Sequence, residues 1–466
     1  MNDQTPPNSA AARDVRNVLH PYTNLRAHEE KGPLVIERGE GVHVFDDEGN
    51  RYIEGMAGLW SVAVGFSEQR LVEAATRQMQ KLPYGHTFSH RSHDPCIDLS
   101  EKLVQMTPEG LDHVFFTNSG SEANDTVIKM VRYLNNARGL PQKKKFIARE
   151  RGYHGVTLAS ASLTGLPLNH GDFDLPIAGV LHTGCAHYYR NAEPGETELD
   201  FSERRARELE EMILAEGPET VAAFIGEPVM GAGGVYVPPE GYWEKIQAVC
   251  RKYDVLIVAD EVITGFGRTG RMFGCETFGI EPDILVLSKQ ISSSYMPLAA
   301  VVVSDAIYQD IADNSAKLGA FGHGFTGSGH PVATAVGLEN LKIIEERDLV
   351  GNAARVGAKL QEGLRALSNH PLVGEVRGIG LIAAVELVAD KDSRASFDPV
   401  GKIGPELVAR CQAHGLLLRP ILDSVAFCPP MVISEAEVDE MLAAFRAALD
   451  ETMGWAEDTL GWTAPA

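Results

Sequence analysis

Polar residues follow short apolar runs at five places in the sequence, and their side chains could do chemistry together. These places are Asn118–Ser121, Tyr153–His154, Glu227, Asp260 and Lys289. In a parallel sheet, ligands bind outside the carboxyl ends of the strands, so we expect the five places to converge at one edge. Together they predict a single site for an anionic ligand that contains a ring.

The most reactive of these groups is Lys289, which ends the run ILVLSK. Partial burial lowers the pKa of a lysine amine and makes it a nucleophile for a carbonyl carbon. Asp260 ends VLIVAD in the same way and could keep a nearby nitrogen base protonated. The alternatives are a lysine that extends its amine into water and an aspartate that caps a helix.

The stretch NSGSEAND, residues 118–125, predicts a passage from strand to helix. Ser119 can cap the helix, and Glu122 stands three residues later, as a capping box requires. Gly120 lets a ligand approach the backbone closely. The free N–H groups and the helix dipole would then attract an anion, although an ordinary well-capped helix has the same pattern.

Alternating apolar runs and helical stretches predict the element that positions these groups. Helical periodicity over 202–215 and 242–252 separates the runs, which indicates a mostly parallel sheet with helices on both faces. The apolar runs are VFFT (114–117), KFIA (145–148), VAAFIGE (221–227), VLIVADE (255–261), ILVLSK (284–289) and LAAVVVS (298–304).

The two ends of the chain have a different pattern. Residues 33–66 alternate apolar and polar and predict an antiparallel meander with a turn at 47–50. We expect helices over 335–346 and 349–369, strands near 371–388, 416–419 and 425–428, and a last helix from Ser434, which forms a capping box with Glu437. Because neither end of the chain has enough residues to form a hydrophobic core of its own, we expect the two ends to pack together as one small domain. Residues 1–32 are predicted to form an N-terminal arm and helix, of which 1–12 are flexible. Residues 33–70 and 334–466 are predicted to form the two parts of a small domain, and residues 71–333 a large domain.

Composition and charge narrow the function classes. The 466 residues contain 42 Lys and Arg against 64 Asp and Glu, a net charge of −22, which argues against nucleic acid as a partner. The one basic run, Lys143–Lys145, is expected to be a solvated turn before a strand. The six cysteines are scattered without a CxxC pair, and neither a signal peptide nor an apolar run of about 18 residues is present. These features predict a cytoplasmic protein that does not enter a membrane.

The motifs together resemble the class III pyridoxal-phosphate aminotransferases. The resemblance rests on NSGSEAN, GYHG, DEVITGFGRTG, SKQISSSYMPLAA and GHGFTGSGHPVA, in this order. HPYTN, GLWSVAVGFSEQR and VAFCPP resemble the ω-amino acid:pyruvate and amine:pyruvate branch in particular. The family implies an α/β structure of fold type I, with a mostly parallel seven-stranded sheet in the large domain and a smaller α+β domain.

The resemblance implies a role for each matching residue around pyridoxal 5'-phosphate. Lys289 matches the lysine that forms the internal aldimine and later moves the proton, and Asp260 matches the acid that pairs with the ring nitrogen. Thr326 matches a residue that reaches the phosphate of a neighbouring subunit, which implies a homodimer with shared sites and leaves a tetramer open. The other implied cofactor-binding residues are Ser119, Gly120 and Ser121 at the phosphate, Tyr153 and Val262 on the two ring faces, and His154, Glu227 and Phe325.

For the substrate, the resemblance implies an aromatic wall and a mobile arginine. Arg419 matches the arginine that binds a substrate carboxylate and moves away for a bare amine. The implied wall consists of Trp60, Tyr22 and Phe88, with Tyr153 and Ala232 also at the substrate. Two departures from the family put the substrate range in question: Leu422 stands where glycine is usual, and Tyr236 where a smaller aliphatic residue is usual.

The implied activity is transamination from an ω-amino acid or primary amine to pyruvate, giving alanine by a ping-pong mechanism. The main alternative is another pyridoxal-phosphate reaction on the same fold, such as an aminomutase, racemase or decarboxylase reaction.

Other classes of protein fit the sequence less well. GFGRTG (265–270) fits a nicotinamide-binding pattern, but no helical sequence follows it. A non-enzymatic pyridoxal-phosphate-binding regulator would need a DNA-binding module fused in front, but the N-terminal segment is short, strand-like and not basic. The histidines of HTFSHRSH and HTGCAHYY do not have metal-ligand spacing, so no metal is expected.

Overall fold

The structure is a computed structural model that describes residues 8–463. The first seven residues of the arm predicted over 1–12 lie outside this range. The expectation of a flexible arm is wrong for the rest, because helix α1 (Ala10–Asn17) begins there with the Ser9 hydroxyl accepting from the Ala12 N–H. Helix α2 (Leu25–Lys31) follows.

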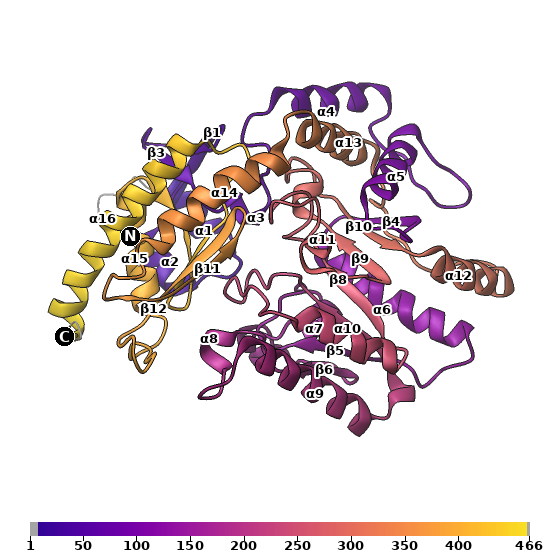
Figure 1. Cartoon of the computed structure of the whole chain (residues 1–466). Helices are drawn as coiled ribbons and strands as arrows, with labels where there is room; N and C mark the ends of the chain where they lie inside the picture. The colour runs from indigo at the N-terminus through magenta and orange to yellow at the C-terminus, as the bar shows by residue number, and fades with distance from the viewer. Residues whose placement is uncertain (1–7, 464–466) are drawn as a thin grey trace.

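The centre of the large domain is the expected mostly parallel sheet of seven strands (Figure 1). Only β10 runs antiparallel to its neighbours β4 and β9. In spatial order the strands are β4 (His113–Thr117), β10 (Ala299–Val303), β9 (Ile284–Leu287), β8 (Leu256–Asp260), β7 (Val221–Gly226), β5 (Lys145–Arg149) and β6 (Val180–Thr183).

Helices cover both faces of this sheet because its strands are apolar on both sides. Successive residues of β7 belong to different cores: Phe224 packs into one, and Ala223 and Ile225 into the other. The helices from α4 onward that precede β11 and α14 are α4 (Gln69–Lys81), α5 (Asp94–Met106), α6 (Gly120–Ala137), α7 (Leu158–Leu163), α8 (Tyr188–Asn191), α9 (Glu198–Glu216), α10 (Tyr242–Lys252), α11 (Gly274–Phe278), α12 (Asp305–Leu318) and α13 (Pro331–Glu346), with short 3-10 turns at Pro167–Asn169, Gly171–Phe173, Pro218–Thr220 and Lys289–Ile291.

The two ends of the chain meet in one sheet. The expected meander forms β1 (Ile36–Glu40), β2 (His43–Asp46) and β3 (Arg51–Glu54), and β13 (Leu416–Leu417) pairs in parallel with β3. A second four-stranded sheet has the order β11 (Val373–Ile379), β12 (Ile382–Leu387), β15 (Ser424–Phe427) and β14 (Arg419–Ile421). Helices α14 (Leu349–Arg365), α15 (Ile403–Ala413) and α16 (Glu435–Leu460) pack beside these sheets (Figure 1).

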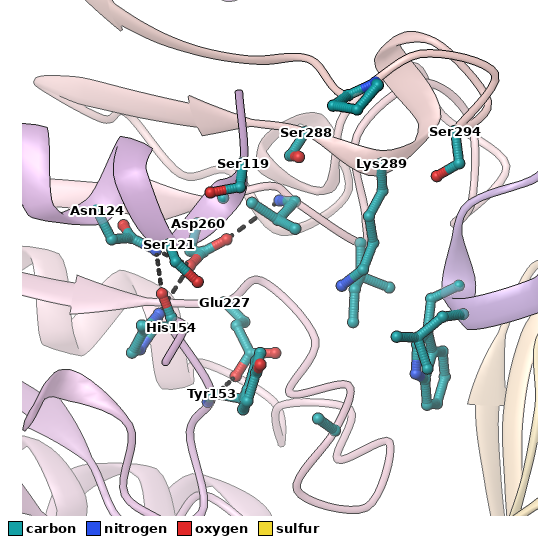
Figure 2. A pocket seen from close by; sticks show the side chains of 18 of the residues that line it. Ser119, Ser121, Asn124, Tyr153, His154, Glu227, Asp260, Ser288, Lys289 and Ser294 are labelled. Atoms are coloured by element: carbon teal, nitrogen blue, oxygen red, sulfur yellow. Dashed lines mark hydrogen bonds and ion pairs between the residues drawn. The ribbon is translucent and has the colours of Figure 1, made fainter. Parts of the chain in front are cut away.

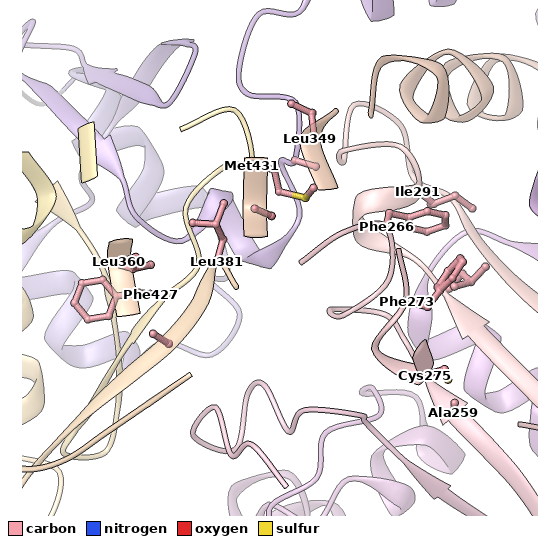
Figure 3. Close-up of a cluster of buried hydrophobic side chains, with 14 of the residues drawn as sticks. Ala259, Phe266, Phe273, Cys275, Ile291, Leu349, Leu360, Leu381, Phe427 and Met431 are labelled. Carbon is pink, nitrogen blue, oxygen red and sulfur yellow. The ribbon is translucent and has the colours of Figure 1, made fainter. Parts of the chain in front are cut away.

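One hydrophobic cluster runs through both parts of the molecule. Phe266 and Phe273 belong to it on the side of the large sheet, and Leu360 and Phe427 on the side of the second small sheet (Figure 3). Because burial of apolar surface is the main driving force of folding, this cluster holds the two parts together. Short α3 (Ala57–Trp60) lies beside the junction and has non-helical backbone at Gly58 and Leu59.

Four sequence-based expectations need correction. Strand β6 was not among the predicted runs, since VLHT is too short and polar to stand out. Helix α9 begins at Glu198 rather than 202 because Thr197 and Asp200 form a capping box. Helix α13 begins earlier than 335, at Pro331, and α14 ends before 369. Lys143 is buried rather than solvated, with its amine 2.6 Å from Asp254 Oδ2.

Among residues 8–463, no helix is both long and apolar enough to cross a lipid bilayer.

Candidate active site

The predicted chemical groups converge on one cavity of about 380 Å³ at the carboxyl ends of β7, β8 and β9 (Figure 2). Glu227, Asp260 and Lys289 reach it from these three strand ends. Thirteen of the predicted site residues line this cavity: Tyr22, Trp60, Ser119, Gly120, Ser121, Tyr153, His154, Glu227, Ala232, Asp260, Val262, Lys289 and Arg419.

The N-terminus of α6 forms one wall of the cavity. Ser119 caps the helix by accepting from the Glu122 N–H at 3.2 Å, as expected. The capping box is incomplete, because Glu122 accepts from the backbone and amide of Asn118 instead of from Ser119. The first N–H groups of a helix have no partner within it, so those of Gly120 and Ser121 can serve an anion. A side chain at Gly120 would crowd Val262, since its Cβ would lie 3.2 Å from Val262 Cγ2.

Asp260 is a buried carboxylate held by three polar neighbours. Its Oδ2 accepts from Asn124 Nδ2 at 2.9 Å and contacts His154 Nδ1 at 2.8 Å, and its Oδ1 accepts from the Val262 N–H at 3.1 Å. Burial alone would raise the pKa of Asp260, but the bonds to His154 and Asn124 outweigh it and place the pKa below its ordinary value. The carboxylate therefore stays charged and can stabilise a protonated nitrogen base.

Lys289 lies opposite, with its side chain extending into the space that Glu227 and Tyr153 border (Figure 2). Burial lowers the pKa of the Lys289 amine, although the charges of Asp260 and Glu227 oppose this effect. A lowered pKa makes the neutral, nucleophilic amine more available. The backbone of Lys289 is left-handed, with φ +46°, a conformation that L-residues adopt only at a cost.

Glu227 connects the loops around the cavity. Its Oε1 accepts from the Tyr153 N–H at 3.0 Å, and its Oε2 accepts from the Gly231 N–H at 2.9 Å. Burial raises the pKa of Glu227 above its ordinary value. Burial and the neighbouring Tyr22 hydroxyl raise the pKa of Tyr153, so the phenol is neutral. Glu227 therefore fixes Tyr153 at the wall of the cavity.

The other end of the cavity contains an aromatic wall and a cation. Trp60 is buried at 1% exposure, whereas Tyr22 is 58% exposed and accepts from Asn169 Nδ2 at 2.5 Å. Arg419 is the first residue of β14, in a hairpin with β15. A guanidinium at the end of an aromatic cavity can bind a carboxylate by charge-assisted hydrogen bonds.

Three predicted site residues do not line the cavity of their own chain. Phe88 and Thr326 are exposed, and Phe325 is half-buried. They lie near one another, because the Phe88 ring packs on Gly324 and the Tyr84 hydroxyl donates to the Thr326 carbonyl at 3.1 Å. Their roles stay predictions, and only that of Thr326 was predicted to concern a neighbouring subunit.

The two departures from the family pattern lie in different surroundings. Leu422 occupies the β14–β15 turn with φ +55°, where glycine is the usual residue. Tyr236 does not line the cavity. Its ring stacks on His187 and lines a second cavity of about 370 Å³. An effect of Tyr236 on the substrate would therefore be indirect.

The sequence reasoning missed a polar residue of the cavity that contacts the predicted machinery directly. Asn124 lines the cavity, is buried, and donates both to Asp260 and to the His154 carbonyl. Its signal was an asparagine on the apolar face of α6, next to Ala123 and one turn before Val127. Asn118, which belongs to the first of the five predicted places, also lines the cavity. Other cavity residues without a predicted role are Leu59, Gly155, Leu166, Ile263, Ser288, Ser292, Ser294, Met296, Pro297 and Leu298.

This fold, with a lysine and an aspartate at adjacent strand ends and an anion site at a helix N-terminus, is that of the fold type I pyridoxal-phosphate enzymes. A sequence model of the class-III aminotransferases matches residues 25–449. The chain therefore belongs to the class III aminotransferases, which use pyridoxal phosphate. It is a pyridoxal-phosphate-dependent aminotransferase.

Individual relatives agree with this family. The chain is 52% identical over 437 residues to "Gamma aminobutyrate transaminase 1, mitochondrial" of Solanum lycopersicum, which covers 94% of this chain and 85% of the relative. It is 62% identical to the crystal structure of the ω-transaminase from Pseudomonas jessenii in complex with PMP, with a TM-score of 0.96, 97% of this chain and 100% of that chain covered. A structure described as a transaminase with L-Ala is 60% identical, with a TM-score of 0.90, 90% of this chain and 99% of that chain covered.

Proposed function

We propose that this aminotransferase moves an amino group from an ω-amino acid or a primary amine to pyruvate, and so produces alanine. The observation that carries the proposal is the position of Arg419, which lines the same cavity as Lys289. A carboxylate at Arg419 and an amino group at Lys289 would be held at opposite ends of one substrate. Relatives named for γ-aminobutyrate, an ω-amino acid, and for ω-transaminases support it.

The chain's own residues fit the cofactor. When bound, pyridoxal phosphate supplies an electron sink for the carbanion that forms when a substrate proton is removed. Asp260 would pair with the ring nitrogen, and Gly120 and Ser121 would hold the phosphate with their N–H groups. Lys289 would hold the aldehyde carbon, and its amine, once free, would accept the substrate proton and return it at another carbon.

The side walls would orient the cofactor and substrate. Tyr153 and Val262 would lie on the two faces of the ring, and His154 would keep Asp260 charged. Trp60 and Tyr22 would contact the apolar part of the donor. Because donor and acceptor use one cavity in turn, we expect ping-pong kinetics.

The absorbance of the bound cofactor tests this proposal. Purified holoenzyme is mixed with β-alanine or with 1-phenylethylamine, without any keto acid, and the visible band is followed. Bleaching by a donor and recovery on addition of pyruvate are expected. Recovery with 2-oxoglutarate but not with pyruvate would overturn the proposed acceptor. A visible band that neither donor bleaches would favour an aminomutase, racemase or decarboxylase reaction instead.

We also propose a homodimer with shared sites, in which Thr326, Phe325 and Phe88 serve the partner's cavity. Their exposure outside their own cavity supports this arrangement. Mixing a Lys289→Ala chain with a Thr326→Asp chain tests it, because one of the two mixed sites would then contain neither change. Recovered activity is expected, and its absence in a mixed dimer would contradict shared sites.

We propose the cytoplasm as the place of action. All six cysteines are unpaired and buried, as is common in reducing compartments. Burial raises the pKa of several of these thiols, to about 11 at Cys96 and about 12 at Cys250, so they are unreactive. Fractionation of the source cells with an antibody to the chain would test the location, and recovery in a membrane-enclosed fraction would contradict it.

A further inference from the structure

Three side chains of the N-terminal segment converge on one point away from the active-site machinery. Asp14 of α1 has its Oδ2 2.8 Å from His20 Nε2 and 3.0 Å from His28 Nε2 of α2. The two imidazole rings lie with their centroids 4.1 Å apart. Two imidazole nitrogens thus face one carboxylate oxygen, and the three atoms, from three places in the chain, lie within 4.8 Å of one another.

This donor set is one that first-row divalent metal ions prefer. Imidazole nitrogen and carboxylate oxygen bind Zn²⁺ at about 2.0–2.2 Å, and tetrahedral ligands then lie about 3.4 Å apart. The observed spacings of 2.8 and 3.0 Å need only a small outward movement to admit an ion. All three side chains retain some exposure, between 11% and 27%, so water can complete the coordination.

A second cluster of the same kind shows what distinguishes the first. His187, Glu375 and Glu386 also place their ligand atoms close together. There the protein supplies the cation itself, because Arg377 Nη1 lies 2.6 Å from a carboxylate oxygen of each glutamate. A divalent ion would be repelled by that guanidinium. Among the ion pairs of residues 8–463, neither lysine nor arginine reaches Asp14.

The cluster flanks Tyr22, a residue of the substrate cavity, in the sequence. Tyr22 lies between His20 and His28, has φ +49°, and lines the cavity from an exposed loop. A tyrosine keeps a left-handed backbone conformation on an exposed loop only where neighbouring groups fix it there. A link between α1, the loop and α2 would therefore limit the positions that Tyr22 can take.

We propose that Asp14, His20 and His28 form a binding site for a divalent transition metal ion, such as Zn²⁺. The bound ion links α1 to α2 and fixes the loop that carries Tyr22. The ion takes no part in the amino-group transfer, and its binding does not depend on the proposed substrate.

Calorimetric titration of the holoenzyme with Zn²⁺, in a buffer free of phosphate and chelators, tests the site. Saturable binding of one ion per chain is expected in the wild type. His20→Ala, His28→Ala and Asp14→Asn should each weaken it by at least about 10- to 100-fold, the loss typical even for groups that only support a metal ligand. His113→Ala is the matched control, since His113 is another partly exposed histidine paired with one acid, Asp305. Affinity that is unchanged in the three variants, or absent in the wild type, would overturn the site.

Limited trypsin digestion tests the link to the loop. Arg16 and Arg26 are cleavage sites in the two helices that flank it. Zn²⁺ should slow cleavage at both in the wild type and in His113→Ala, chelation should reverse this, and His20→Ala should show no effect. Wild-type cleavage at an unchanged rate under saturating Zn²⁺ would overturn the fixing of the loop.

Discussion

The cavity has two ends that differ in how firmly their residues are held. At the end of Asp260 and Lys289, the groups come from adjacent strand ends, and Asp260 is buried while Lys289 is half-buried. At the other end, Tyr22 and Arg419 come from an N-terminal loop and a hairpin, and Tyr22 is 58% exposed. The comparison suggests that the fold fixes the reaction chemistry more tightly than the choice of substrate.

Residues with a strained, left-handed backbone occur at both ends of the cavity, but the hydrogen bonds and burial that hold them in place differ. The left-handed Lys289 is followed by Gln290, whose amide donates to the carbonyls of Ile263 and Gly265 at 2.7 and 2.8 Å. Asn340 donates to the Gln290 carbonyl, and Arg268 donates to its side chain. These groups are fully buried, so the strain at Lys289 is held by a hydrogen-bonded network.

At the substrate end, the residues with a left-handed backbone are more exposed and have fewer hydrogen-bond partners. Leu422 has φ +55° and is 48% exposed in its turn, and Tyr22 has one amide donor, Asn169. Exposed segments with few buried contacts open at low free-energy cost. If Arg419 binds a carboxylate as we propose, an arginine on such a hairpin can move without disturbing Asp260.

The largest effect is expected at the firmly held end. Lys289→Ala should lower kcat by more than about 10³-fold, because it removes both the covalent attachment and the proton carrier. Single- and multiple-turnover assays with a bleaching donor would measure this. Lys317→Ala, an exposed lysine in the last turn of α12, is the control and should keep full activity. Sustained turnover by Lys289→Ala would contradict the role of this amine.

Asp260→Asn should lower kcat by about 10²- to 10³-fold while the fold is kept. Asparagine fits the same space beside Asn124 and His154 but cannot hold a neighbouring nitrogen in its charged form. Stopped-flow measurement of proton removal, with circular dichroism as the check on folding, would test this. A near-normal rate would show that the charge of Asp260 has no electronic role.

At the loosely held end, replacing Arg419 is expected to weaken the binding of substrates that carry a carboxylate and of no others. Arg419→Ala should raise KM for β-alanine and pyruvate by about 10- to 100-fold, the effect of a lost charge-assisted hydrogen bond. KM for 1-phenylethylamine, which has no carboxylate, should change by less than about threefold on the same reasoning. Equal losses for both donors would show that Arg419 does not bind the carboxylate.

Glu54, a half-buried acid six residues before Trp60, gives a pH-dependent effect. Glu54 accepts from the Met56 N–H at 3.0 Å, just before the strained turn that carries Trp60, and burial raises its pKa to about 7. The unfolded carboxyl loses its proton near pH 4.5, whereas the folded one keeps it to about pH 7. The contribution of this group to stability is therefore present below pH 4.5 and decreases as pH rises toward 7.

Glu54→Gln removes this titration. Relative to the wild type, the variant should gain stability by about 2 kcal/mol between pH 5 and pH 8, a shift of one pKa unit being about 1.4 kcal/mol. Urea unfolding at the two pH values would measure the difference. A stability difference that does not change with pH would contradict a raised pKa at Glu54.

The sequence predicted the firmly held end better than the other. Asp260, Glu227 and Lys289 each end an apolar run, and the carboxyl ends of parallel strands must meet, so their convergence follows from local pattern. Asn124 was missed because its partner Asp260 is 136 residues away. Strand β6 was missed because a four-residue edge strand has too little periodicity. The places of Tyr22 and Arg419 came from family resemblance, since nothing local says which loops meet.

The smallest effect is expected at Leu422. Glycine there would relieve a left-handed conformation that costs a non-glycine residue about 1–2 kcal/mol, and would lose about 0.5–1 kcal/mol to the greater freedom of the unfolded chain. Leu422→Gly should therefore be neutral or stabilising by up to about 1 kcal/mol. Leu318→Gly, at a 67% exposed leucine in the helical backbone of α12, is the matched control and should destabilise by about 0.5–1 kcal/mol. Thermal unfolding of both variants compares them, and an equal loss would show that the turn at Leu422 is unstrained.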